Sequence, residues 1–340
     1  MLTTSRANQI SRVKTKSNRA EWIDIVRGVT MLLVVYSHVC SSSSSLNSIF
    51  LTTRMPLFFF ISGFFMYSVE YNAQLIWRRT KNRICKQLYP TIIIFSIFII
   101  AFYNHDFSYI FHEYKIGYWF TYVSVLYFFT LVPILYLFTK YKIRSKVRII
   151  VFVFLMVSTL ILHHLIVQHT SFLTSKLSGL LSFDHYISYF RYLICGCVFR
   201  IFWNKYNAQL MNWVGFIVCA AYFIVSICVG GILSLFTAFA GIYVMLFTFY
   251  KLSNYFSKHI TFRAFSFVGS MTLEIYLLHY FLLSFKEIPA IRHLINSTTN
   301  TLWEFPVVAT TSILIILFCL LIVWLLRSIK IYPLLFGKNN

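Results

Sequence analysis

The sequence is poor in acidic residues and in charge of either sign. Only 9 of its 340 residues are Asp or Glu, against 30 Lys and Arg, and 11% of the chain is charged while 59% is hydrophobic. A soluble domain needs a far more polar surface than this to cover its core, so the composition excludes a soluble globular protein. It is typical of a polytopic membrane protein.

Cysteine and histidine are too scattered to build a metal site or a disulfide framework. Cys195 and Cys197 are the closest pair of the seven cysteines, and their spacing points them to different faces of a helix. We therefore expect the cysteines to be small core residues. The histidines form no HxxxH or histidine–carboxylate set, so no metal cofactor is expected.

Long polar segments are also missing. No segment between the apolar runs exceeds about twenty residues, which leaves no room for a second soluble domain. The first apolar run follows a polar tail and lacks a small-residue cleavage pattern, so we expect it to remain as a membrane span and not to be removed as a signal sequence.

Apolar runs follow one another along the whole chain. A helix of about 20 apolar residues crosses a ~30 Å hydrocarbon core, and ten runs of roughly that length predict an all-α polytopic membrane protein. The runs lie near 22–42, 49–69, 90–104, 118–138, 149–168, 185–202, 213–229, 231–250, 265–285 and 305–327. The third is short, and its helix is allowed to begin inside the basic segment before it. The predicted domains are an N-terminal tail at 1–21, a membrane domain at 22–327 and a C-terminal tail at 328–340.

The basic residues are concentrated in every second one of the segments that flank and join these runs. One alternating set, which includes both tails, holds 23 of the 30 Lys and Arg, and the opposite set holds four. Positive charge collects on the cytoplasmic side of membrane proteins, so both tails are predicted to be cytoplasmic, in a multi-pass protein of the cell membrane. The same distribution explains the net charge of +21 without nucleic acid, and it favours contact with anionic lipid headgroups.

The first span, within "EWIDIVRGVTMLLVVYSH", carries charged groups at two depths. Arg27 and His38 are eleven residues apart, which puts them on nearly the same face of a helix with a rise of about 16 Å between them. Asp24 lies one turn before Arg27, close enough to pair with it. The alternative is that neither residue has a catalytic or binding role: Arg27 only extends to the headgroups, and His38 is an interfacial histidine.

The second span contains "TTRMPLFFFISGFF". Arg54 lies at its predicted outer end, a short turn away from His38, where it is a candidate to stabilise an anion or oxyanion. Pro56 is predicted to start this helix, because a missing N–H costs least there. Gly63 is expected to let another helix approach closely.

A basic stretch, "WRRTKNRICKQLYP", follows the second span. It contains Arg79, Arg83 and Lys86 among five cations close to the predicted cytoplasmic mouth of the first helix. Such a cluster suits a polyphosphate ligand, but positive-inside sorting alone also produces it.

The ninth span contains "SMTLEIYLLHYFLL", with Glu274 and His279 inside an apolar helix. An ionisable residue within a span is costly and usually faces the bundle interior with a partner or a ligand. Five residues separate the two, which is far from sharing a face, so we do not expect them to form a catalytic pair. We interpret His163 and His164 as interface residues at the outer end of their span, and Arg191 as an intramembrane arginine without an assigned role.

These segments together resemble the integral-membrane acyltransferase family three, whose members O-acylate sugars, and most of all its fucose 4-O-acetylase-like branch. The likeness rests on the first-span segment, then "RMPLFFFISGFF", "RICKQLYP", "GYWFTYVSVLYF" and "SMTLEIYLLH", in that order along nearly the whole chain. The most specific element is the arginine and histidine of the first helix, Arg27 and His38.

The resemblance implies an acyl-CoA donor in the cytoplasm, acetyl-CoA by preference, and a glycan acceptor outside. The family's basic R-x-x-R pair corresponds to Arg83 and Lys86, where Lys keeps the charge but loses the bidentate phosphate geometry of Arg. On this basis His38, Arg27, Arg54 and Glu274 are the candidate catalytic residues, and Arg83, Lys86, Arg79 and Arg27 the candidate donor-binding residues.

Two other classes of function are compatible with polar groups inside spans. A transporter or flippase for a lipid-linked sugar also needs Arg, Glu and His around a central cavity. A non-catalytic membrane sensor or scaffold does not require polar groups on one helix face at two depths, so this class explains the pattern less well. Transfer of an acyl group from acetyl-CoA distinguishes the enzyme from both.

Overall fold

The structure is a computed structural model of the chain, and it describes residues 21–167, 175–229, 234–256 and 259–337. The predicted N-terminal tail therefore lies almost wholly outside the described residues. The described part is built of helices and turns and contains no strand, as expected for an all-α protein.

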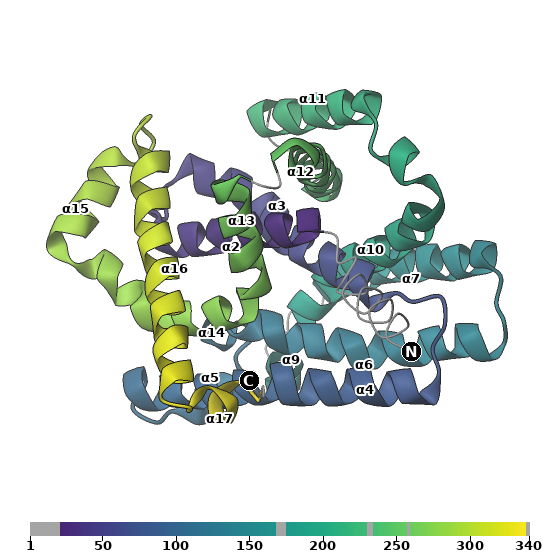
Figure 1. The fold of residues 1–340 in the computed structure, drawn as a ribbon, viewed down its shortest axis with the longest axis horizontal. Coiled ribbons are helices and arrows are strands. Elements are labelled where there is room, and N and C mark those ends of the chain that lie inside the picture. The colour runs from purple at the N-terminus through teal and green to yellow at the C-terminus, as the bar shows by residue number, and fades with distance from the viewer. Residues whose placement is uncertain (1–20, 168–174, 230–233, 257–258, 338–340) are drawn as a thin grey trace, which may run out of the picture.

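Within the described residues, each apolar run that the sequence predicts as a span contains a helix (Figure 1). The longer ones are α2 (Glu21–Val39), α3 (Ser45–Met66), α4 (Ala73–Arg83), α5 (Tyr89–Phe102), α6 (Trp119–Lys140), α7 (Ser145–Val167), α10 (Phe183–Leu210), α11 (Trp213–Val229), α12 (Ser234–Phe256), α13 (Ile260–Ser270), α14 (Thr272–Leu282), α15 (Pro289–Thr298) and α16 (Glu304–Ser328). Short helices are η1 (Ile84–Leu88), η2 (Phe107–Phe111), η3 (Lys115–Gly117), α9 (Lys176–Leu181), η4 (Leu283–Glu287) and α17 (Tyr332–Phe336).

Fewer helices than ten meet the length and hydropathy that a membrane crossing requires. Within the described residues seven do, or eight if α13 and the Thr272–Glu287 segment count as one span bent by 84°. Of the other two predicted spans, α11 has only 17 residues, and α10 is long but is not apolar enough. Polar and charged side chains along α10, Arg191 and Arg200 among them, lower its hydropathy.

The prediction that Pro56 starts the second helix is wrong. The helix α3 begins at Ser45, eleven residues earlier, and Pro56 lies inside it. Ser44 caps the helix by accepting a hydrogen bond from the Asn47 N–H, so a serine of the preceding run supplies the start signal. Arg54 therefore lies in the body of the helix and not at its end, and it is 9% exposed.

The helix of the third span begins inside the basic stretch, as the sequence analysis allows. Residues Ala73–Phe102 form a single helical rod of 30 residues that includes α4, η1 and α5. At η1 the helix widens to a π turn, in which the Tyr89 N–H bonds the Ile84 carbonyl. Pro90 follows at once, and because it has no N–H and its ring crowds the carbonyl four residues before it, a local widening relieves the conflict.

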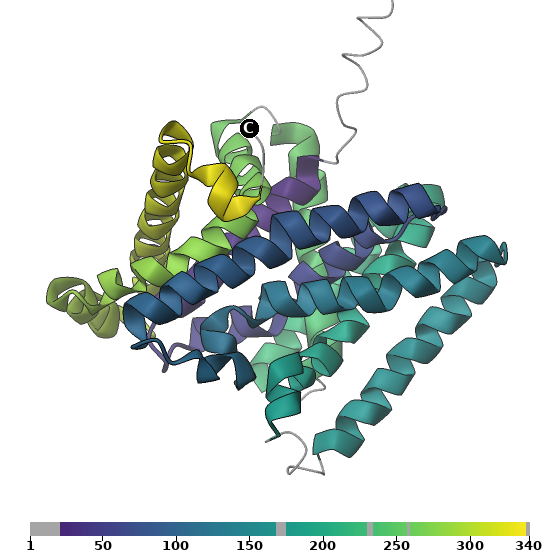
Figure 2. The ribbon, with the colours of Figure 1, turned by 90° about the horizontal axis from the view of Figure 1, so that it is seen from below.

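Helix α2 lies at the centre of the bundle. It packs against α3, α12, α13, α14 and α16, and most of its side chains are buried. Figure 2 shows the α4–α5 rod running beside α6, across one side of this bundle. The chain bends between α13 and α14, so that α13 crosses α2 while α14 contacts both α2 and α5. Arg27 of α2 lies beside this bend, where it bonds Thr272 of α14.

Gly63 has the close-packing role that the sequence predicts. A Cβ atom at this position would lie 1.9 Å from the carbonyl oxygen of Leu193 in α10. The contact is with backbone, which cannot move aside, so only glycine fits where α3 and α10 cross.

Candidate functional site

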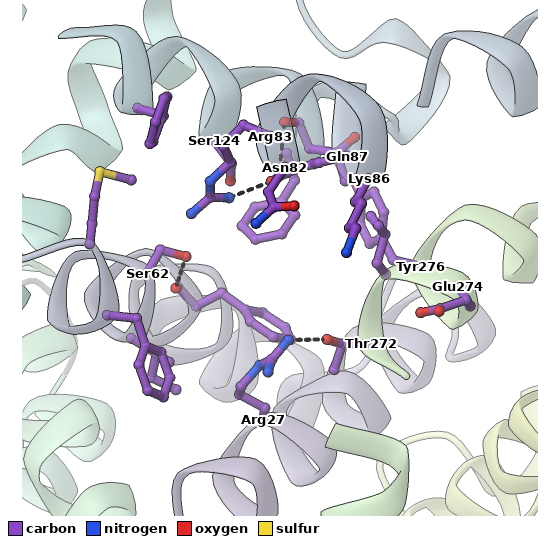
Figure 3. A pocket seen from close by; sticks show the side chains of 18 of the residues that line it. Arg27, Ser62, Asn82, Arg83, Lys86, Gln87, Ser124, Thr272, Glu274 and Tyr276 are labelled. Carbon is purple, nitrogen blue, oxygen red and sulfur yellow. Dashed lines mark hydrogen bonds between the residues drawn. The ribbon is translucent and has the colours of Figure 1, made fainter. Parts of the chain in front are cut away.

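A polar pocket of about 530 Å³ lies beside α2 at the α13–α14 bend (Figure 3). Its walls come from α2, α3, the α4–α5 rod, α6 and α14. The polar residues that line it are Arg27, Ser62, Arg79, Asn82, Arg83, Lys86, Gln87, Thr121, Ser124, Ser270, Thr272, Glu274 and Tyr276. The four cations that the sequence singles out as donor-binding candidates therefore line one cavity.

Arg27 is held in the pocket wall by partners on two helices. Its Nη1 donates to Asp24 Oδ1 at 3.3 Å, which confirms the predicted pairing one turn apart. Its Nη2 donates to Thr272 Oγ1 at 2.6 Å, on the first turn of α14. Two nitrogens of one planar guanidinium thus bridge α2 and α14, and this geometry is not available to a single ammonium group.

The opposite wall comes from the basic rod. Figure 3 shows Asn82, Arg83, Lys86 and Gln87 on the helix facing Arg27 across the cavity. Arg83 donates from Nη1 to Gln87 Oε1, and Gln87 in turn donates to the Thr121 carbonyl at 3.1 Å. These two consecutive hydrogen bonds fix the Arg83 side chain against α6. Lys86, in contrast, is exposed and extends into the cavity.

Arg79 lies where α3 ends. Its Nη1 donates to the Met66 carbonyl at 2.8 Å and to the Tyr71 hydroxyl. A carbonyl at a helix C-terminus carries partial negative charge, so this contact also stabilises the end of α3. Arg79 therefore uses part of its hydrogen-bonding capacity to stabilise the fold, whereas Lys86 extends into the cavity.

Glu274 lies in the wall of this pocket, about one and a half turns of α14 before His279. The carboxylate is 1% exposed and accepts a hydrogen bond of 2.6 Å from the Tyr332 hydroxyl, on the short helix α17. Arg327 stacks on the Tyr332 ring at 4.6 Å. Glu274 thus joins α14 to the C-terminal segment, a contact between residues too distant in the sequence for their spacing to predict.

His38 belongs to a second polar cluster at the other end of α2. Its Nε2 lies 3.3 Å from the Tyr280 hydroxyl, and the His279 ring centroid is 5.3 Å from that of His38. Lys286 donates to the main-chain carbonyl of His38 at 2.7 Å. His279 is fully buried, while His38 is only partly buried.

Arg54 reaches toward this second cluster from α3. Its Nη1 donates to the Leu33 carbonyl of α2 at 3.4 Å, a little over one turn before His38. Its Nε is buried and has no hydrogen-bond partner among the residues that the structure describes. A buried cationic donor of this kind is suited to an anionic group.

The two clusters lie along the same pair of helices. Arg27 contacts Thr272 and His38 contacts Tyr280, so α2 and α14 run parallel and the face of α2 that carries both residues is the face toward α14. This agrees with the predicted shared face. Neither His38 nor Arg54 lines the pocket, but Tyr276 does, and its ring centroid lies 5.7 Å from that of His279.

A strained turn before α6 supports the second cluster. Lys115, Ile116 and Gly117 all have left-handed backbones, with φ of 42°, 51° and 94°. The Gly117 carbonyl accepts hydrogen bonds from the hydroxyls of Tyr276 and Tyr280, the latter at 3.2 Å. A Cβ at Gly117 would lie 2.1 Å from the Tyr280 hydroxyl, so glycine is required for this contact with the tyrosine beside His38.

Lys115 anchors that turn. Its buried Nζ donates to the Gly179 carbonyl at 2.6 Å and to Ser182 Oγ at 2.8 Å. Burial lowers the pKa of Lys115 from its ordinary 10.5 to about 8, and Glu113 offsets part of that effect. Between pH 8 and 10.5 the unfolded chain therefore binds more protons at Lys115 than the folded one, and stability should rise with pH in that window.

Thermal midpoints in detergent test this expectation. We predict that the midpoint of the wild type, minus that of Lys115→Met, increases between pH 8 and pH 10 and is nearly constant from pH 6 to pH 7.5. Met fills a similar volume without a titrating group, so midpoints that vary in parallel over the whole range would contradict the assignment.

The sequence analysis does not single out several residues of the site. Gln87 follows Arg83 by four residues, which is the spacing of side-chain partners on a helix, and Tyr280 is adjacent to His279. Thr272 and Lys286 meet α2 only through the fold, 245 and 248 residues away from their partners. Arg191, His163 and His164 do not line the pocket.

No group of three or more His, Cys, Asp or Glu side chains within the described residues is arranged to hold a metal ion. The seven cysteines are unpaired, and three of them, Cys40, Cys197 and Cys319, are buried, while Cys228 is exposed.

Comparison with known families identifies the kind of protein to which this architecture belongs. Residues 20–327 match a family model described as an acyltransferase domain, Acyl_transf_3. Searches of curated proteins and of solved structures found no match. The family model covers most of the chain and includes both polar clusters, and the described helices include at least seven that are long and apolar enough to cross a membrane. The chain is therefore a multi-pass membrane protein that belongs to acyltransferase family 3.

Proposed function

We propose that the protein transfers a short acyl group, acetyl by preference, from cytoplasmic acyl-CoA to a sugar hydroxyl of a cell-surface or lipid-linked glycan at the plasma membrane. The observation that carries the proposal is the arrangement of the two polar clusters. A pocket lined by four cations lies at one end of α2, a histidine cluster lies at the other, and α14 contacts both.

The pocket suits the phosphate-bearing part of CoA. Arg83 and Lys86 face Arg27 across the cavity, and Arg79 lines it as well. Phosphate oxygens are bound well by guanidinium forks and by ammonium groups. Arg83 offers a fork that Gln87 already orients, and Lys86 offers a point charge. The pantetheine arm then extends along α2 toward His38, over the ~16 Å that eleven helical residues rise.

His38 acts where the thioester meets the acceptor. As neutral imidazole it takes the proton of the sugar hydroxyl while the hydroxyl oxygen attacks the thioester carbonyl, a role that contributes typically 10² to 10⁴-fold. The tetrahedral intermediate then loses the CoA thiolate as the C–S bond breaks, and the thiolate takes the proton from the imidazolium. An acyl-histidine formed first on His38 gives the same products, and both routes remain open.

Arg54 and Glu274 have different parts in this scheme. The unpartnered Nε–H of Arg54 lies on a side chain that bonds α2 near His38, where it is suited to the oxyanion of the tetrahedral intermediate. Glu274 is in the wall of the cationic pocket and bonded to Tyr332, so we assign it to holding that wall and not to the proton transfer.

Two measurements test the proposed function. Membranes containing the protein should transfer label from radiolabelled acetyl-CoA to glycan, and surface polysaccharide from cells without the gene should lack the corresponding O-acyl group. A transporter or flippase needs no acyl donor, so the absence of transfer in membranes with abundant protein would contradict the proposal.

The donor site gives a kinetic prediction. Replacing Arg83 and Lys86 together with Gln should raise the KM for acyl-CoA more than it lowers kcat, because phosphate contacts remote from the thioester contribute largely uniform binding. Steady-state kinetics over a range of acetyl-CoA concentrations measures both constants.

The same helix supplies a matched control. Arg78 and Lys81 are exposed cations of α4 that do not line the pocket, so the Arg78→Gln, Lys81→Gln double variant removes the same charge and should leave the KM near wild type. Equal KM values in the two double variants would mean that Arg83 and Lys86 do not bind acyl-CoA and serve only to orient the chain in the membrane.

A further inference from the structure

His279 is fixed in one tautomer by the main chain. Its Nδ1 lies 2.7 Å from the Tyr276 carbonyl oxygen and 3.2 Å from that of Ile275. A carbonyl oxygen only accepts hydrogen bonds, so Nδ1 must carry the proton. In the neutral ring Nε2 then carries a lone pair and is an acceptor.

This acceptor nitrogen is buried without a partner. His279 is 0% exposed, and its Nε2 has no hydrogen-bond partner within the described part of the chain. Leaving a polar atom buried and unsatisfied destabilises the folded state, and such atoms in native proteins call for a functional or structural explanation. Nothing in the packing of α14 requires a histidine to be there, since its neighbours are mostly aromatic and apolar.

The His38 ring lies close enough to supply a donor to this lone pair. The two ring centroids are 5.3 Å apart, and two imidazoles joined by an N–H···N bond of about 3 Å have their centroids about 5 Å apart. His38 Nε2 already lies beside the Tyr280 hydroxyl, which leaves Nδ1 as the nitrogen available to His279. The bond requires the partly buried His38 ring to turn its Nδ1 toward His279 Nε2.

We propose that His279 is a positioning residue for His38, accepting the His38 Nδ1–H at its own Nε2 during acyl transfer. The inference rests on the proposed role of His38. In the structure, the Tyr280 hydroxyl donates to the Gly117 carbonyl and so accepts from His38 Nε2. Held by His279 instead, His38 carries its proton on Nδ1, and its Nε2 leaves Tyr280 and presents a lone pair to the acceptor hydroxyl. The imidazolium that forms keeps an acceptor for its Nδ1–H. In serine hydrolases a buried carboxylate orients the catalytic histidine in a comparable manner; here a neutral histidine, itself oriented by helix carbonyls, does so without burying a charge.

Two variants of His279 with similar volume separate this role from a structural one. His279→Gln places an amide oxygen, which is also an acceptor, close to the position of Nε2, whereas His279→Leu offers none. We expect His279→Leu to lower kcat roughly 100-fold with the KM for acetyl-CoA unchanged, and His279→Gln to stay within about tenfold of wild type. The thermal midpoint of His279→Leu should be at or above that of wild type, because the change removes an unsatisfied buried atom.

Other outcomes would overturn the proposal. A purely structural His279 predicts activity that follows stability, so wild-type kcat in His279→Leu, or equal losses in both variants together with lowered midpoints, would contradict a positioning role. His38→Ala, assayed beside them, distinguishes the two failures. If His38→Ala is inactive while His279→Leu is fully active, only the role of His279 fails; if His38→Ala is active, the proposed role of His38 fails as well.

Discussion

Replacing His38 with Ala is expected to abolish acyl transfer while leaving the protein abundant and folded. Loss of the proton acceptor removes a contribution of typically 10² to 10⁴-fold, and the same change removes the nucleophile if an acyl-histidine forms. The fold should tolerate it, since the hydrogen bond from Lys286 goes to the His38 main chain, which Ala retains. Transfer of label from acetyl-CoA, at matched protein level, measures the effect.

His293→Ala is the control for this variant. His293 is an exposed histidine of α15, away from the pocket and from the His38 cluster, and its replacement should leave turnover unchanged. Normal glycan acylation by a well-expressed His38→Ala variant would remove His38 from the mechanism.

Arg27→Lys is expected to lower activity at least tenfold although the charge is kept. The Arg27 guanidinium bonds Asp24 through Nη1 and Thr272 through Nη2, and thereby fixes α2 against the first turn of α14 in the pocket wall. A lysine ammonium is a single point charge and does not reproduce this planar fork. A tenfold loss corresponds to ~1.4 kcal/mol of transition-state stabilisation.

Turnover at saturating and at limiting acetyl-CoA measures this prediction. The thermal midpoint and the detergent-solubilised yield should stay close to wild type. Arg263→Lys, at an exposed position of α13, makes the same chemical change outside the pocket and should leave turnover unchanged. Near-wild-type turnover by Arg27→Lys would mean that acyl transfer does not need the guanidinium fork of Arg27.

The fold class follows from sequence because long apolar runs leave few alternatives to membrane helices. Helix ends and breaks follow less directly. Pro56 lies inside α3 since Ser44 supplies an earlier cap, and the basic stretch continues α5 since a π turn accommodates Pro90. The bend of 84° after α13 was not predicted either, although the pocket lies beside it. These features depend on local backbone adjustments that hydropathy does not record.

The site was predictable where one helix carries the pattern, and not where the fold brings helices together. The spacing of Asp24, Arg27 and His38 indicates their shared face without any structure. The bond from Arg27 to Thr272 joins residues 245 positions apart, and no periodicity predicts it. The tautomer of His279 is set by main-chain carbonyls of its own helix, which only coordinates reveal.

The proposed function requires acyl transfer across the membrane, from a donor on the cytoplasmic side to an acceptor outside. Sealed membrane vesicles of the two orientations, each given radiolabelled acetyl-CoA from the bulk solution, test it most directly. We expect label in the glycan when the cytoplasmic face is exposed to the solution, and little or none in vesicles of the opposite orientation. Transfer only from acetyl-CoA supplied at the outer face would contradict it.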